Sequence, residues 1–181
     1  LSPLRQGYYK YMQHVKSGVN FKPLPEWVID NYKGFFTNGL LRDVRIGDST
    51  DSKETSSITD CRQIVFVPGV TGSLYSSDPN IQKSHITHVL HEISHWDQCM
   101  TMPNNVLGSH RDYYADMWFG HLEVGVVKAL AASNFSVSSA QIHDKMPMEV
   151  DADEKAAEIV VATGIGTPPG NVISPPLECS I

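Results

Sequence analysis

The sequence predicts one mostly helical α+β domain with a small β-sheet beside a central helix. Most of the chain carries apolar residues at helical spacing, whereas two short stretches have the β-branched and aromatic composition of strands. At 181 residues the chain is long enough to bury one substantial core. We therefore expect a single domain over residues 1–163, followed by a Gly/Pro-rich tail over residues 164–181.

The apolar periodicity places the predicted helices along the chain. They cover residues 4–15, 26–36, 85–100, 113–130 and 149–163. Pro25 favours the start of the second helix, because the first turn does not use the N–H that proline lacks. Ser84 is expected to cap the third helix, since a hydroxyl there can accept a hydrogen bond from a free backbone N–H. Pro103 and the two asparagines after it are stop and turn signals, so we expect this helix to end near Met100.

The remaining segments read as two strands and two loops. Residues 44–46 form a short predicted strand, and residues 63–67 form a clearer one that Pro68-Gly69 ends. Residues 48–60 are rich in Ser, Thr and Asp and predict a mobile loop. Residues 72–80 are also predicted to be a loop, which leads into the third helix.

Residues 91–95 of the third helix read H-E-I-S-H. Side chains four residues apart lie on one face of a helix, so the imidazoles of His91 and His95 can bind one metal ion. Glu92 could then act as a general base on a water molecule, as in the H-E-x-x-H zinc peptidases. The motif alone equally fits a helix whose two histidines only form hydrogen bonds on a polar face.

A third ligand is expected, because catalytic zinc usually has three protein ligands and one open position. Glu149 and Asp153 are four residues apart on the last helix, so Glu149 could supply an oxygen while Asp153 accepts the N–H of a metal-binding histidine. The same helix has small residues suited to close packing, namely Ala152, Ala156, Ala157 and Val160. The alternative is an acidic, solvent-exposed helix, which would leave His121 or Asp151 as ligand candidates.

These motifs resemble the bacterial DUF4157 family, a metallopeptidase-like domain whose signature reads H-E-L-x-H-x-x-Q. In this sequence Gln98 stands at the final position, and Ile93 replaces the usual leucine. The resemblance is strongest over residues 24–99 and 149–160. Its other matching stretches are residues 24–25, 44–47 and 64–69. The later E-x-x-x-D pattern followed by two alanines resembles the second helix of gluzincin peptidases.

The resemblance implies a zincin-like fold and a zinc-dependent endopeptidase that acts on a protein or peptide substrate. Glu92 would be the general base. The residues that match the family's zinc ligands are His91, His95 and Glu149. Two other hypotheses stay open: a non-catalytic metal-binding or interaction module, and a peptidase that serves as the cargo of a toxin or effector.

A long insert over residues 101–147 departs from the family pattern. Because an oxyanion intermediate needs a further donor, we expect this insert to form one wall of the cleft and to supply that donor. The candidates in or near it are His110, Tyr113, Tyr114, His121 and His143. The alternative is that the tyrosines only pack beneath the insert's helix. His85 and His88 flank the motif and receive no role.

Composition excludes some functional classes. The formal net charge of −6 disfavours a nucleic-acid-binding protein, which normally has a basic surface. No apolar run approaches the ~18 residues that a membrane span needs. Hydrophobic residues make up 41% and charged residues 19%, as in a globular enzyme.

The three cysteines leave the redox state open. Cys61 precedes a predicted strand and Cys99 ends the third helix, so the two could meet if the strand packs on that helix. Cys179 would then remain a free thiol. Reduced, buried thiols are at least an equal alternative, so the compartment stays open, with secretion or export slightly favoured over a cytoplasmic location.

Overall fold

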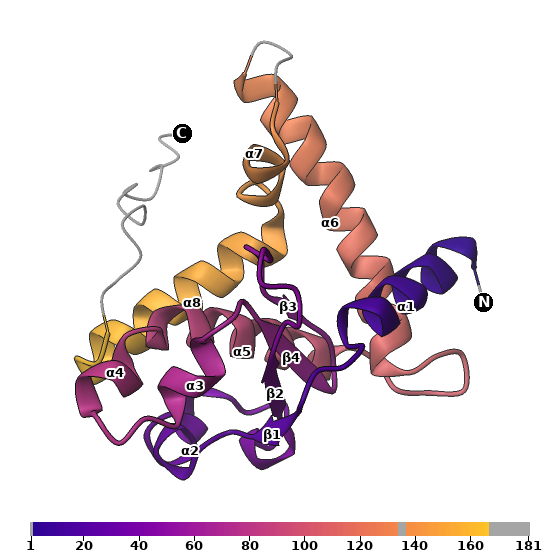
Figure 1. The fold of residues 1–181 in the computed structure, drawn as a ribbon. Coiled ribbons are helices and arrows are strands. Elements are labelled where there is room, and N and C mark those ends of the chain that lie inside the picture. Colours follow the sequence, from indigo (N-terminus) through magenta and orange to yellow (C-terminus); the bar gives the residue numbers. More distant parts are fainter. Residues whose placement is uncertain (1, 134–136, 167–181) are drawn as a thin grey trace.

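The computed structural model describes residues 2–133 and 137–166, and it confirms the mostly helical α+β class (Figure 1). The helices are α1 (Pro3–Val15), α2 (Glu26–Tyr32), α3 (Val70–Leu74), α4 (Pro79–Lys83), α5 (Ile86–Thr101), α6 (His110–Ala132), α7 (Ser139–His143) and α8 (Pro147–Thr163). Two short 3₁₀ turns are η1 (Lys33–Phe35) and η2 (Leu41–Asp43). The strands are β1 (Lys22–Pro23), β2 (Arg45–Asp48), β3 (Ile58–Thr59) and β4 (Gln63–Phe66).

The four strands form one small sheet in the order β1-β2-β4-β3. β2 and β4 are parallel, with Arg45 opposite Gln63, and both carry apolar side chains that the core buries. β3 pairs antiparallel with β4, with Ile58 opposite Val65, and forms one edge of the sheet. This edge lies against α5, so the sheet and the motif-bearing helix meet there.

The main hydrophobic core lies between the sheet, α2, α5 and α8. Its apolar side chains on α5 recur every three or four residues, which gives this helix one buried face. They are Ile86, Val89, Leu90, Ile93 and Trp96. Full burial of one such aliphatic side chain contributes about 1.5–3 kcal/mol, so this face fixes the rotation of α5.

Helix α8 crosses the core next to α5, and the two helices make the most extensive contact in the fold. The predicted small-residue face is the buried one, since Ala152 and Ala156 are almost fully inaccessible. Small side chains allow two helix backbones to approach closely. This contact places Glu149 and Asp153 of α8 beside the histidines of α5.

Helices α6 and α7 project from the body of the molecule, and α1 packs against the base of α6 (Figure 1). Ser109 and Asp112 form a reciprocal capping box that starts α6, three residues earlier than the sequence periodicity predicts. A second apolar cluster joins α1 to α6. It contains Tyr8, Met12, Cys99, Tyr114, Ala115, Met146 and Met148.

Several sequence-based expectations were wrong at the local level. Ser84 does not cap α5, because its hydroxyl donates to the carbonyl of Ile81 at the end of α4. The predicted loop over residues 72–80 contains the end of α3 and the start of α4, which Asp78 caps. The predicted loop over residues 48–60 contains strand β3. The helix predicted over residues 26–36 ends at Tyr32 and continues as η1.

Cys61 and Cys99 form a disulfide bond, with their Cα atoms 5.1 Å apart. The bond ties the segment between β3 and β4 to the last turn of α5, 38 residues later in the sequence. Cys179 and most of the expected tail lie outside the described residues. Among the helices described, none is both long enough and apolar enough to span a membrane.

Candidate metal centre

The structure brings His91, His95 and Glu149 together at the contact between α5 and α8. The Nε2 atoms of the two imidazoles are 3.0 Å apart. Glu149 Oε2 lies 3.2 Å from Nε2 of His91 and 3.0 Å from Nε2 of His95. His95 and Glu149 are buried, and His91 is partly buried. The three ligand atoms lie close enough together to hold one metal ion.

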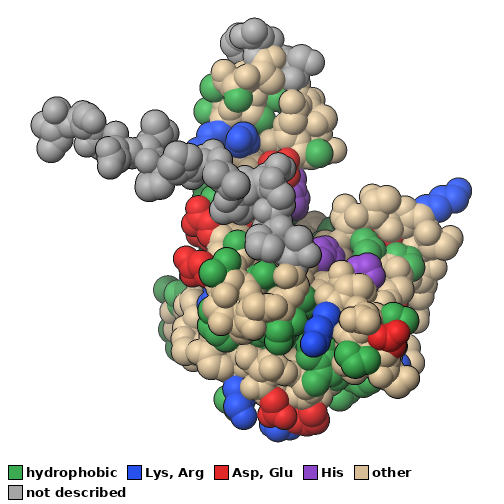
Figure 2. Space-filling model, turned by 90° about the vertical axis from the view of Figure 1, so that its left-hand side faces the viewer, with side chains coloured by type: hydrophobic (Ala, Val, Ile, Leu, Met, Phe, Trp, Pro, Cys, Tyr) green, Lys and Arg blue, Asp and Glu red, His purple; other side chains and the backbone are tan. Residues whose placement is uncertain are grey.

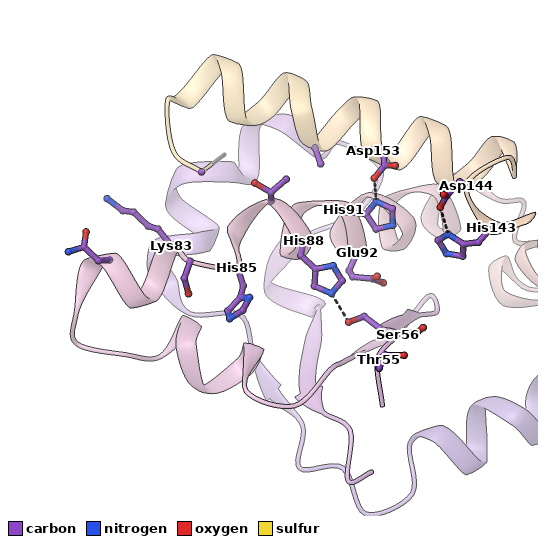
Figure 3. Close-up of a pocket in the computed structure, with 16 residues that line it drawn as sticks. Thr55, Ser56, Lys83, His85, His88, His91, Glu92, His143, Asp144 and Asp153 are labelled. Carbon is purple, nitrogen blue, oxygen red and sulfur yellow. Dashed lines mark hydrogen bonds and ion pairs between the residues drawn. The ribbon is translucent and has the colours of Figure 1, made fainter. Parts of the chain in front are cut away.

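The second nitrogen of each imidazole is held by an oxygen atom. His91 Nδ1 lies 2.7 Å from Asp153 Oδ1, which comes from the next turn of α8 (Figure 3). His95 Nδ1 lies 2.9 Å from Gln98 Oε1, and the amide of Gln98 donates to the Met148 carbonyl. An Nδ1–H that donates to an oxygen leaves the Nε2 lone pair free, which is the tautomer that metal binding at Nε2 requires.

The close packing of these groups changes their protonation in the metal-free protein. Burial lowers the pKa of His91, but the hydrogen bonds to Asp153 and Glu149 outweigh it and raise the pKa to about 10. Burial also raises the pKa of Glu149, and the hydrogen bonds to His91 and His95 outweigh this and hold it below its usual range. Protons and a metal ion therefore compete for the same three side chains.

Glu92 lies on the same helix and is 4% exposed. The hydroxyl of Thr59 in strand β3 donates to Glu92 Oε2 over 2.5 Å and also lies 3.3 Å from the Glu92 backbone carbonyl. The edge strand thus fixes one carboxylate oxygen of Glu92. Sequence reasoning missed Thr59, because a two-residue strand inside a polar segment has no recognisable periodicity.

Two cavities meet at Glu92. The larger, of about 710 Å³, lies between α5, α8 and the segment before β3, and it is lined by His88, His91 and Asp153 among others. The smaller, of about 240 Å³, reaches Tyr114 and both buried ligands, His95 and Glu149. Figure 2 shows histidine side chains in the hollow below the projecting α6 and α7. The candidate metal centre is therefore open to small molecules from this cleft.

The structure separates the candidates for an oxyanion donor. His110 bonds the Met102 carbonyl, and Tyr113 donates to Asn105 over 3.1 Å, so neither is placed at the centre. Tyr114 is 2% exposed and lines the smaller cavity. Burial, with added repulsion from Tyr8 and Glu149, raises its pKa well above the usual value, which keeps the hydroxyl protonated.

The other candidate from the insert that reaches the centre is His143, at the end of α7. Its Nε2 lies 3.2 Å from Glu149 Oε2, and its side chain is more than half exposed to the cleft. His121 instead accepts the backbone N–H of Met148 over 3.2 Å. Asp151 is exposed and lines a different pocket. Neither of these two alternative ligands belongs to the group of converging atoms found in the described part of the chain.

His88 and His85 both line the larger cavity (Figure 3). His88 Nε2 lies 2.6 Å from the hydroxyl of Ser57, which also accepts the backbone N–H of Val67. The ring of His88 stacks on that of His91, with centroids 6.5 Å apart. His88 therefore forms part of the cleft wall and supports the candidate ligand His91.

Comparison of the chain with protein-family models, curated proteins and solved structures finds no match.

Proposed function

We propose that this chain is a zinc-dependent endopeptidase with a zincin-like fold. The observation that carries the proposal is the convergence of the Nε2 atoms of His91 and His95 with a carboxylate oxygen of Glu149. The buried Glu92 lies on the same helix as the two histidines. Two histidines and one glutamate are a ligand set of catalytic zinc sites, which leave the fourth position open. The resemblance to the DUF4157 family points to the same activity.

The distances in the candidate metal centre would let one metal ion contact all three ligand atoms. The three distances between the ligand atoms here are 3.0, 3.0 and 3.2 Å. Asp153 and Gln98 supply the oxygen partners that keep the imidazoles in the binding tautomer. When bound, zinc would polarise the substrate carbonyl and acidify water.

Glu92 is the proposed general base, which accepts a proton from water and passes it to the leaving amine. Its side chain lies beside both cavities, so it can reach a substrate from the cleft. The Thr59 hydroxyl occupies Oε2 and orients the carboxylate, which leaves Oε1 as the atom that takes the proton. A buried carboxylate is costly, and a module that only binds metal has no need of it.

Tyr114 is the proposed donor to the oxyanion. Its protonated hydroxyl is a hydrogen-bond donor in a buried position, and it shares the smaller cavity with Glu92 and Glu149. His143 enters the same cavity from α7 and is the alternative donor. The edge strand β3 also lines this cavity, so its residues would border a bound peptide.

The test compares the parent chain with Glu92→Gln, both supplied with zinc, in a digest of an unbiased peptide library read by mass spectrometry. The amide keeps the shape of the side chain and can accept the Thr59 hydroxyl, but it cannot take up a proton. We expect cleavage by the parent and none by Glu92→Gln at equal zinc content. Equal cleavage would refute the general-base role, and no cleavage by the parent would favour the non-catalytic metal-binding module.

A further inference from the structure

A second polar pocket lies on the other side of α1 from the candidate metal centre. Tyr8 and Tyr11 of α1 line the smaller cavity beside Glu149, whereas Tyr9 and Gln13 of the same helix line this pocket of about 630 Å³. The pocket takes no part in the proposed peptidase reaction. Its walls come from α1, the start of β4 and the first turn of α6.

The pocket holds three cationic side chains: Lys16, Arg62 and Arg111. One buried carboxylate, Asp60, faces them. Asp60 Oδ2 lies 2.5 Å from Lys16 Nζ and 3.2 Å from Arg111 Nη2, while Oδ1 accepts the backbone N–H groups of Arg62 and Gln63. The guanidinium of Arg62 has no carboxylate partner among residues 2–133 and 137–166. Three positive charges thus face one negative charge, in a chain whose net charge is −6.

Two carboxylates of α6, Asp112 and Asp116, are bound by Arg5 of α1. Arg5 binds Asp116 through two nitrogens, at 2.9 and 2.5 Å, and also lies 3.9 Å from Asp112. The hydroxyl of Tyr9 donates to Asp112. The guanidinium of Arg111 lies 4.4 Å from the centre of the Tyr9 ring, and its Nε atom is buried with no hydrogen-bond partner in the described part of the chain. Counted together with Arg5, Asp112 and Asp116, the four cations of this region exceed its three carboxylates by one positive charge.

We propose that this pocket binds an oxoanion of the phosphate or sulfate type. Two guanidinium groups and one ammonium group can each donate to the oxygens of such an anion, and stacking on Tyr9 holds Arg111 in place. Gln13, Ser17 and Gln63 add neutral polar groups to the wall. The volume lies within the range of about 300–1,000 Å³ for small-molecule sites, so the pocket has room for the organic part of a phosphate ester.

The test measures binding of inorganic phosphate and of phenyl phosphate to the full chain by isothermal titration calorimetry, at an ionic strength held constant with sodium chloride. Arg62→Gln removes one cation and leaves the ion pairs of Asp60 intact, so this variant should fold. Lys128→Gln is the control of equal charge. Lys128 is exposed on α6, about 25 Å along the helix from Arg111 at 1.5 Å per residue.

We expect both probes to bind to the parent and to Lys128→Gln with the same affinity, and to bind at least about tenfold more weakly to Arg62→Gln, as for the loss of one hydrogen bond to a charged group. Tighter binding of phenyl phosphate would identify an ester as the ligand, and equal binding a free anion. Equal affinity in Arg62→Gln and the parent would overturn the proposal, because the anion would then bind elsewhere. Binding of a Glu-rich peptide without binding of either phosphate would also overturn it, in favour of an acidic protein segment.

Discussion

Asp153 supports the candidate metal centre through a single contact, and its removal measures the contribution of that contact. Asp153 Oδ1 lies 2.7 Å from His91 Nδ1, and no other hydrogen bond to this nitrogen is present among the described residues. Asp153→Ala removes the acceptor that holds a proton on Nδ1, so the imidazole can adopt the other tautomer. Loss of such a support typically costs about 10–100-fold in metal affinity, which is about 1.4–2.8 kcal/mol. Since the Asp153 side chain is 53% exposed, we expect a value near the lower end.

The assay is a competition titration in which a chelator of known affinity and the protein share a limited amount of zinc. The matched control is Asp151→Ala, which removes the same charge from an exposed position on the same helix. Asp153→Asn should fall between parent and Asp153→Ala, because its amide oxygen can still accept the imidazole N–H. If Asp153→Ala and Asp151→Ala bind zinc equally well, the carboxylate does not orient His91 and the reasoning fails.

Three further results are expected from the same geometry. Thr59→Val should lower kcat by about 10–100-fold at unchanged zinc content, because the charged carboxylate of Glu92 loses a hydrogen bond. Thr59→Ser keeps the hydroxyl and should keep most of the activity. Equal kcat in both variants would show that the Thr59 hydroxyl does not support Glu92. Tyr114→Phe should lower kcat by about 10²–10³ if its hydroxyl donates to the oxyanion, and a comparable loss in His143→Ala alone would transfer the role to that histidine. Zinc binding near pH 7 should release at least one proton, because the pKa of His91 is raised to about 10 and its proton must leave before the metal binds. The affinity for zinc should therefore fall with decreasing pH. Calorimetry in buffers of different ionisation enthalpy measures the released protons, and a result of no release would contradict this prediction.

The sequence was sufficient where helix geometry converts spacing into direction. His91 and His95 are one turn apart, and so are Glu149 and Asp153, so each pair had to share a face. The alanines of α8 showed that its acidic side chains border a closely packed surface. The structure accordingly places these four side chains together, while their binding of a metal stays a prediction.

The sequence was insufficient where position depends on contacts between distant segments. Thr59 reaches Glu92 across 33 residues, from a two-residue strand that is defined by its pairing with β4. Ser84 has the residue type of a helix cap, but the short helix α4 before it uses its hydroxyl instead. The sequence could not show which of Tyr113 and Tyr114 faces the cleft. Apolar residues occur on most sides of α6, so their pattern does not indicate which side of this helix is buried.

The most direct measurement is the metal content of the purified full chain after zinc loading and dialysis against metal-free buffer, determined by inductively coupled plasma mass spectrometry. Parent and Lys128→Gln are compared with His95→Ala, whose circular dichroism is measured to confirm that it folds. We expect one zinc ion per chain in the parent and in Lys128→Gln, and none in folded His95→Ala, because the loss of Nε2 removes one of the three converging ligand atoms. A parent chain without zinc, or a His95→Ala variant that retains a full equivalent, would contradict the assignment of this site as the metal centre.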